Sequence, residues 1–109
     1  MTDKIVVLVT CSSAKEARKI ARAVVEGRLA ACANILMSPV HSVYRWKGTV
    51  ESAKEILLII KTTKTRFPKL KAEVKRLHTY DVPEIIALPI ATGASDYLAW
   101  ISESVAEAK

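Results

Sequence analysis

The chain has 109 residues, of which 50% are hydrophobic and 26% charged, and its formal net charge is +6. This length suits one domain, so we expect a single domain over residues 1–109, and the composition excludes a disordered or fibrous chain. The first residues lack the pattern of a secretory signal, and no apolar run approaches the roughly 20 residues that cross a bilayer. We therefore expect a cytoplasmic protein whose two cysteines, Cys11 and Cys32, are reduced thiols.

The N-terminal part of the chain predicts a strand followed by a helix. Residues 4–10 form an unbroken β-branched run that is typical of a buried strand. Ser13 and Glu16 form a capping-box pattern, and apolar residues at helical spacing predict a helix over residues 14–26. Gly27 is expected to supply the left-handed turn that ends this helix.

The middle of the chain predicts a long β-hairpin. Residues 31–47 alternate imperfectly between apolar and polar, which indicates a strand that is interrupted at Pro39. Gly48 makes the turn, and residues 50–61 return as a third strand with a continuously apolar centre.

The last third of the chain predicts a helix, a strand and a final helix. Pro68 suits the first turn of a helix that ends near His78. Residues 84–91 form the fourth strand, and Ser95 can cap the final helix. The expected order is therefore βαββαβ with a trailing C-terminal helix.

The prolines indicate which strands lie at the edges of the sheet, because a proline cannot donate to a ladder and is confined to edges, strand starts or bulges. Pro39 and Pro89 place the second and fourth strands at the edges, which gives the sheet order 4-1-3-2 of a ferredoxin-like α+β sandwich. The two crossover helices then cover one face. Because the first and third strands are apolar on both faces, we expect the open face to be buried in an obligate oligomer.

The positive charge is concentrated in residues 61–78, where seven basic residues face one acidic residue, Glu73. The basic residues are Lys61, Lys64, Arg66, Lys69, Lys71, Lys75 and Arg76. Such a stripe is more often the solvated face of an amphipathic helix than a phosphate-binding surface. RNA binding suits the charge, but the aromatic-rich patterns that stack bases are missing.

No short motif predicts an enzyme. The sequence has no P-loop, GxGxxG turn, GxSxG elbow, HExxH helix or CxxC pair. A thiol and imidazole site could draw on Cys11, Cys32, His41 or His78, although no close spacing supports it and a packing role is commoner for Cys32.

The segment 78–84 concentrates an imidazole, a phenol and two carboxylates between the second crossover helix and the fourth strand. Such donors suit a borderline divalent metal ion, and a thiol from a neighbouring element would favour copper. A structural interpretation is equally open, in which His78 and Thr79 cap the helix and Pro83 fixes the turn.

Long stretches of the sequence resemble the CutA divalent-cation-tolerance proteins. The matching stretches are residues 29–35 (LAACANI), 44–48 (YRWKG), 55–62, 78–90 (HTYDVPEIIALPI) and 96–100 (DYLAW). The resemblance covers nearly the whole chain in order. It implies a ferredoxin-like protomer in a tight trimer similar to the PII signalling proteins, cytoplasmic in bacteria, with copper binding as the usual activity.

The resemblance also implies candidate residues. Cys32, His78 and Glu84 match positions typical of the family and are the candidate metal ligands. Cys11 inherits no role, because the match is poorer after the first strand. The aromatic residues that match, Tyr44, Trp46, Tyr80 and Trp100, are better explained as anchors of a subunit interface than as ligand stacking groups.

Two further functions stay open. In one, the chain is a PII-like module that binds a small anionic metabolite at subunit clefts near Lys61 and the basic helix. In the other it is an enzyme, which is the least supported because no nucleophile, base and oxyanion donors can be assembled from the sequence.

Overall fold

The computed structural model describes residues 2–107 as four strands, three α-helices and one short 3-10 helix. The elements, in chain order, are β1 Lys4–Cys11, α1 Ala14–Glu26, β2 Cys32–Trp46, β3 Thr49–Thr63, η1 Lys64–Arg66, α2 Phe67–Leu77, β4 Ile85–Pro89 and α3 Ser95–Ser104. The order βαββαβ with a trailing helix is the one that the sequence predicts.

The four strands form one antiparallel sheet in the order β2-β3-β1-β4, which reads 4-1-3-2 from the β4 edge. Both strands that contain a proline therefore lie at the edges. The predicted interruption at Pro39 is a register shift between Leu36 and Val40, and β2 continues through it to Trp46. An edge strand tolerates this because its outer backbone groups have no ladder partner to lose.

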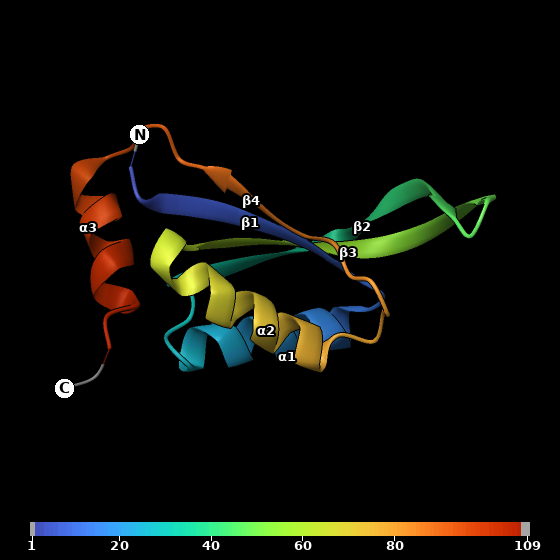
Figure 1. The fold of residues 1–109 in the computed structure, drawn as a ribbon, viewed down its shortest axis with the longest axis horizontal. Helices are drawn as coiled ribbons and strands as arrows, with labels where there is room; N and C mark the ends of the chain where they lie inside the picture. Colours follow the sequence, from blue (N-terminus) through green and yellow to red (C-terminus); the bar gives the residue numbers. More distant parts are fainter. Residues whose placement is uncertain (1, 108–109) are drawn as a thin grey trace.

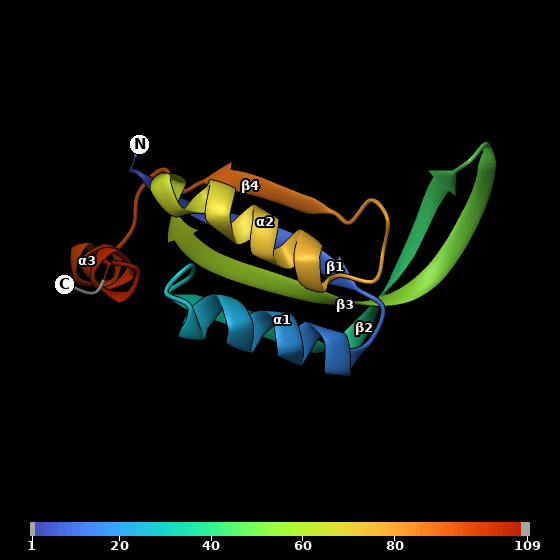
Figure 2. The same ribbon diagram turned by 60° about the horizontal axis from the view of Figure 1, so that its bottom comes forward.

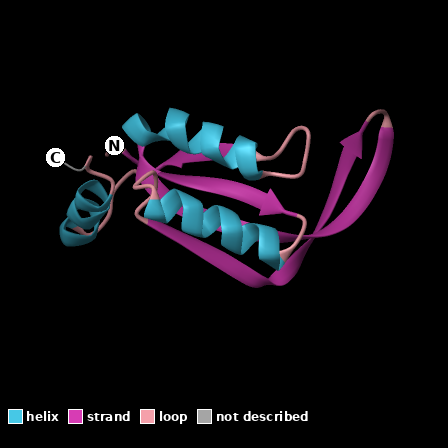
Figure 3. Ribbon diagram, turned by 90° about the horizontal axis from the view of Figure 1, so that it is seen from below, coloured by secondary structure: helices cyan, strands magenta, loops and turns pink. Residues whose placement is uncertain are grey.

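Helices α1 and α2 lie side by side on one face of the sheet (Figures 1 and 3). The core lies between them and the inward-facing residues of the central strands. Its largest fully buried side chains are Val7, Val9, Ile20, Val24, Leu58, Ile60, Leu70 and Val74. This is the split βαβ arrangement, with one sheet face covered by helices.

The other face of the sheet remains apolar. Leu8 of β1 pairs with Ile59 of β3 on this face, and Val6 and Leu57 share the face because alternate residues of a strand point the same way. On the edge strand β4, Ile86 is 50% exposed and Leu88 48% exposed. We call these residues the open apolar face; within residues 2–107, α1 and α2 both lie on the opposite side.

Two helix-end predictions were wrong. Gly27 has a right-handed φ of −82°, and the left-handed residue is Arg28 at φ 58°. The amides of Arg28 and Leu29 donate to the carbonyls of Val25 and Val24, so the helix ends in a Schellman motif one residue later than expected. Ser95 is the first residue of α3 and not its cap, because the N-cap is Ala94, which has no capping side chain.

The β2–β3 hairpin extends beyond the rest of the sheet as a two-stranded arm (Figure 2). At its tip Lys47 and Gly48 both have positive φ, 51° and 80°. Two consecutive left-handed residues make a type I′ turn, whose twist matches that of the flanking strands. The arm carries Tyr44 and Trp46, both partly exposed.

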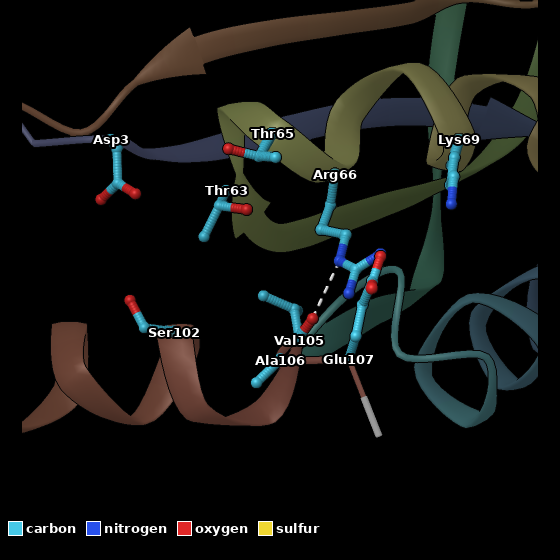
Figure 4. Close-up of a pocket in the computed structure, with 9 residues that line it drawn as sticks. All are labelled: Asp3, Thr63, Thr65, Arg66, Lys69, Ser102, Val105, Ala106 and Glu107. Atoms are coloured by element: carbon cyan, nitrogen blue, oxygen red, sulfur yellow. Dashed lines mark hydrogen bonds and ion pairs between the residues drawn. The ribbon is translucent and has the colours of Figure 1, made fainter. Parts of the chain in front are cut away.

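Helix α3 packs at the end of the sheet opposite the hairpin arm, and Arg66 fastens it there (Figure 4). The Nε of Arg66 donates to the Val105 carbonyl at 2.8 Å, and its guanidinium pairs with Glu107 at 3.3 Å. Ile101 and Val105 pack with Ala31 beneath this contact. Among the described residues, no helix has the length and apolarity needed to cross a membrane.

Candidate metal-binding cluster and adjacent cleft

The candidate cluster forms where β1 ends, α1 begins and α2 ends. The topology brings these ends together, because β1 leads directly into α1 while α2 leads into β4, which is antiparallel to β1 (Figure 1). One donor atom each from Cys11, Glu16 and His78 lie within 4.8 Å of one another. We call these three residues the buried cluster, because all three side chains are almost entirely shielded from solvent.

His78 uses both ring nitrogens. Its Nε2 lies 2.8 Å from the Thr10 carbonyl, which only accepts, so this nitrogen carries the proton. Its Nδ1 is therefore the unprotonated nitrogen, and it accepts from the Tyr80 amide at 3.1 Å. Nδ1 also lies 3.7 Å from Glu16 Oε1. A metal ion that binds Nδ1 would therefore have to displace the Tyr80 amide from this lone pair.

Glu16 joins two segments that are far apart in the sequence. Its carboxylate accepts from the Ser12 amide at 3.3 Å and from the Thr79 amide at 3.2 Å. Ser13 caps the helix as predicted, since its hydroxyl accepts from the Glu16 amide at 3.1 Å. The carboxylate, however, turns inward to Ser12 and Thr79, so the reciprocal half of the predicted capping box is replaced by a tertiary contact.

Cys11 is fully buried and uncharged at neutral pH. Burial, followed by the negative charges of Glu16 and Glu55, raises the pKa of the Cys11 thiol to about 12. A metal ion that binds this sulfur must therefore displace a proton, because the thiolate is the ligand.

A cleft of about 800 Å³ adjoins the buried cluster. One wall is the inner face of the hairpin arm and the other is the segment 79–84 that precedes β4. Its lining includes the aromatic residues Tyr44, Trp46 and Tyr80 and the acidic residues Glu51, Glu55, Asp81 and Glu84.

Tyr80 separates the cleft from the cluster. Its hydroxyl donates to Glu55 Oε2 at 2.9 Å, and its ring centroid lies 4.7 Å from that of His78. Burial and the Glu55 carboxylate raise the pKa of the Tyr80 phenol, so it stays protonated and remains a donor.

The three predicted ligands Cys32, His78 and Glu84 do not form one group within the described protomer. His78 belongs to the buried cluster, and Glu84 lines the cleft. Cys32 lies opposite Lys61 on β3, whereas Cys11, which belongs to the buried cluster, lies opposite Ile56. Lys61 and Ile56 are five residues apart along β3, so Cys32 lies about 16 Å along the sheet from the cluster.

Cys32 lies instead beside α3. Its thiol donates weakly to Asn34 Oδ1 at 3.7 Å, and Asn34 also accepts from Lys61. Burial, followed by the proximity of Cys32, raises the pKa of Tyr97 on α3. This contact places the thiol between the edge of the sheet and the last helix.

Glu16 is absent from the sequence prediction, and Cys11 appears there only as one of four residues that could form a thiol and imidazole site, with no close spacing to support it. Glu16 has the appearance of a helix-cap residue, and nothing local shows that its carboxylate turns inward. The available signal was topological: in a βαββαβ fold, the segment after β1 and the end of α2 lie at the same edge. That rule places Cys11 near His78.

Comparison with known proteins agrees with this fold. Residues 5–104 match the model of the family described as CutA1 divalent ion tolerance protein. The chain is 56% identical over 99 residues to the divalent-cation tolerance protein CutA of Thermus thermophilus, covering 91% of this chain and 95% of that protein. It is 47% identical over 102 residues to human protein CutA, covering 91% of this chain and 56% of that protein.

Solved structures of CutA proteins have the same fold as this chain. The divalent cation tolerance protein of Thermus thermophilus superposes with a TM-score of 0.92 at 53% identity, covering 94% of this chain and 99% of that one. The CutA1 structure from Oryza sativa superposes with a TM-score of 0.91 at 43% identity, covering 96% and 95%. The chain therefore belongs to the CutA1 divalent ion tolerance protein family.

Proposed function

We propose that this protein binds a divalent metal ion at the buried cluster as part of metal tolerance, with copper as the first candidate. The observation that carries the proposal is the meeting of sulfur, nitrogen and oxygen donors from Cys11, His78 and Glu16 within 4.8 Å. Thiolate and imidazole ligands suit copper and zinc, and small shifts would bring such donors to tetrahedral spacing. The role is binding and not catalysis, in a cytoplasmic protein.

Each residue has a defined part in this site. His78 would supply Nδ1 in place of the hydrogen bond that this atom accepts from the Tyr80 amide, because Nε2 donates to the Thr10 carbonyl. Cys11 supplies the sulfur after losing its proton, so binding releases a proton and tightens as pH rises. Glu16 supplies a carboxylate oxygen and balances the charge of the ion.

Calorimetric titration with Cu(II) tests the proposal. A parallel titration with Zn(II) measures binding by a metal ion that has no redox chemistry. Cys11→Ser and His78→Gln are expected to weaken binding at least about tenfold, since even outer-shell changes cost 10–100-fold. Circular dichroism checks that both variants fold.

Matched variants decide between ligand sets. Cys32→Ser and Glu84→Gln remove the other two predicted ligands and leave the buried cluster intact, so they should bind metal like the parent protein. If these two lose binding while Cys11→Ser keeps it, the ligands are Cys32, His78 and Glu84, and the cluster is structural only.

We further propose that the protein is a homotrimer resembling the PII proteins. The open apolar face supports self-association, because a contiguous exposed apolar patch on a small protein marks an interaction surface. A closed ring of three copies would bury this face in each.

A second candidate, a PII-like module for a small anionic metabolite, draws on a hollow of about 430 Å³ between η1 and α3 (Figure 4). Arg66, Lys69 and nearby hydroxyl groups line it, although Asp3 and Glu107 do so too. A rise in melting temperature across a nucleotide and metabolite panel, lost in Lys69→Gln, would favour this function over metal binding.

A further inference from the structure

The outer surface of helices α1 and α2 carries the excess positive charge of this protein. Its exposed basic residues are Lys15, Arg18, Lys19 and Arg22 on α1 and Lys69, Lys71, Lys75 and Arg76 on α2. We call these eight residues the basic helix surface. Two acidic residues, Glu26 and Glu73, lie among them, whereas Glu16 turns inward. The two helices therefore account for the whole formal net charge of +6, and the charges of the remaining residues balance.

The structure adds a second row of cations to the stripe that the sequence indicates. The basic residues of α2 alone are typical of the solvated face of one helix. The fold places α1 side by side with α2 on the same face of the sheet (Figure 3), at the distance of about 10 Å that packed helices usually have. The basic residues of α1 recur every three or four residues, so they form one row along its outer side. The result is a pair of cationic rows, each about 15–20 Å long.

The charges of α1 are placed against the stability of the helix. Lys15 with Lys19 and Arg18 with Arg22 are like-charged pairs at i,i+4, a spacing that destabilises a helix. Lys15 also lies in the first turn, where the helix dipole favours acidic residues, and the last turn has no basic residue. A solvated helix face normally mixes both signs of charge. A polyanion bound along this row would remove the repulsion.

Most of the basic helix surface has no acidic partner of its own. Within residues 2–107, its recorded ion pairs are Arg22 with Glu26 at 3.4 Å and Arg76 with Glu73 at 2.7 Å. The other six cations extend into solvent. The surface lies on the side of the sheet opposite the open apolar face, so the proposed self-association through that face would leave it accessible.

The form of this surface favours an extended polyanion over a small anion. The two cavities described above lie elsewhere, and of the eight basic residues only Lys69 lines either of them. A helix that binds a membrane surface buries an apolar face, whereas the one exposed large apolar side chain recorded on these two helices is Val25.

A nucleic acid duplex meets these conditions. It carries one negative charge per about 1.7 Å of its axis, on a backbone that can follow two cationic rows. Single strands are held by stacking on aromatic side chains, and the described helices α1 and α2 expose none. We propose that the basic helix surface binds the sugar-phosphate backbone of duplex DNA without sequence preference.

Fluorescence anisotropy of a fluorescein-labelled DNA duplex of about 20 base pairs tests the proposal on the full-length protein, with EDTA present to prevent bridging by metal ions. The parent protein should bind with a Kd in the micromolar range at low salt, equally for duplexes of unrelated sequence. Lys19→Gln/Lys75→Gln removes one cation from each helix and should weaken binding at least about tenfold. The slope of log K against log salt concentration should become shallower by about 2, because each lost phosphate contact removes about 0.9.

Lys47→Gln/Lys54→Gln is the matched control, because it removes the same charge from exposed positions on the hairpin arm. It should change the affinity by less than about twofold, since charges far from the contact are screened. Circular dichroism checks that both double variants keep their helices. Cys11→Ser should bind the duplex like the parent protein, so duplex binding and metal binding can fail separately. Equal weakening in the two double variants would show attraction by net charge alone and overturn the proposal.

Two other results would also overturn it. Absence of duplex binding at low salt would show that the cationic rows serve solubility only. Vesicles of phosphatidylserine and phosphatidylcholine provide the second comparison. Sedimentation of the parent protein with these vesicles, lost in Lys19→Gln/Lys75→Gln and without any duplex binding, would assign the surface to an anionic membrane.

Discussion

Few polar side chains in this protein are buried, and His78 is the one on which the cluster depends. It joins the end of β1 to the segment after α2 through the Thr10 carbonyl and the Tyr80 amide. Glu16 adds a second connection between the same regions through Ser12 and Thr79. The hydrogen bonds of the cluster therefore connect these two regions structurally, independent of the proposed metal binding.

Loss of the His78 hydrogen bonds should destabilise the protein. His78→Ala removes the hydrogen-bond partner of a partly buried carbonyl and of a partly buried amide and creates a cavity, which together should cost about 2–4 kcal/mol. Urea unfolding at a fixed protomer concentration measures the change. His41→Ala is the matched control, because His41 is exposed on the hairpin and its loss should change stability by less than about 0.5 kcal/mol. Equal effects would show that the His78 contacts are weak.

The Cys11 thiol predicts how stability depends on alkaline pH. Its pKa is about 12 in the folded protein and ordinarily 9.0, so the folded state holds this proton more tightly. The contribution of this proton to the free energy of unfolding is complete below about pH 9. It is lost as pH rises toward 12, by up to about 1.4 kcal/mol per pH unit. Urea unfolding between pH 8 and 10.5 should show a steeper decline for the parent protein than for Cys11→Val. Parallel curves would contradict the assignment.

The candidate site was only partly predictable from single residues. Segment 78–84 stands out in the sequence because imidazole, phenol and carboxylate groups are adjacent in it, and it does border both the cluster and the cleft. The inward turn of Glu16 depends on an amide 63 residues away, so no local pattern could show it.

Among the elements, the strands and helices follow directly from periodicity, whereas their ends depend on backbone geometry. The end of α1 shows this: glycine is the usual left-handed residue there, yet Arg28 takes that conformation while Gly27 stays right-handed. The added Cβ of a residue at position 27 would lie 3.1 Å from the Ala23 carbonyl, so close packing explains this glycine.

The Schellman motif predicts a stabilising substitution. Arg28→Gly removes the strain of a side chain at φ 58°, and after the entropy of the glycine in the unfolded chain is subtracted we expect a gain of about 0.5–1 kcal/mol. Chemical denaturation measures it. Gly48→Ala, at φ 80°, should shift stability in the opposite direction by about 1 kcal/mol. A loss in Arg28→Gly would show that the arginine side chain contributes more than the backbone strain costs.

At the scale of the whole molecule, strand order and helix placement follow from two prolines and the rules of connection. The surplus of apolar residues in β1 and β3 also appears in the structure as the open apolar face. The sequence cannot show how copies would meet there in the proposed trimer, because an interface depends on the shape of two surfaces and not on the pattern of one.

Ile86→Lys tests whether the open apolar face holds copies together. A charge at this half-exposed position should shift sedimentation toward the single chain while circular dichroism stays unchanged, because Ile86 lies outside the helix-covered core. Val25→Lys places the same charge on a partly exposed residue of α1, on the opposite side of the sheet, and should leave the assembly intact. Dissociation by both variants would point to net charge as the cause.

The hairpin arm gives the protomer an elongated outline of 46 × 27 × 24 Å and a radius of gyration of 14.4 Å, against about 13 Å for a compact chain of this length. A ribbon of two strands is only marginally stable in water by itself. In dilute solution the arm would therefore fray at its tip while the helix-covered body stays folded. With the proposed self-association, unfolding is then expected in two stages, and the protomer concentration should set the difference in stability between them.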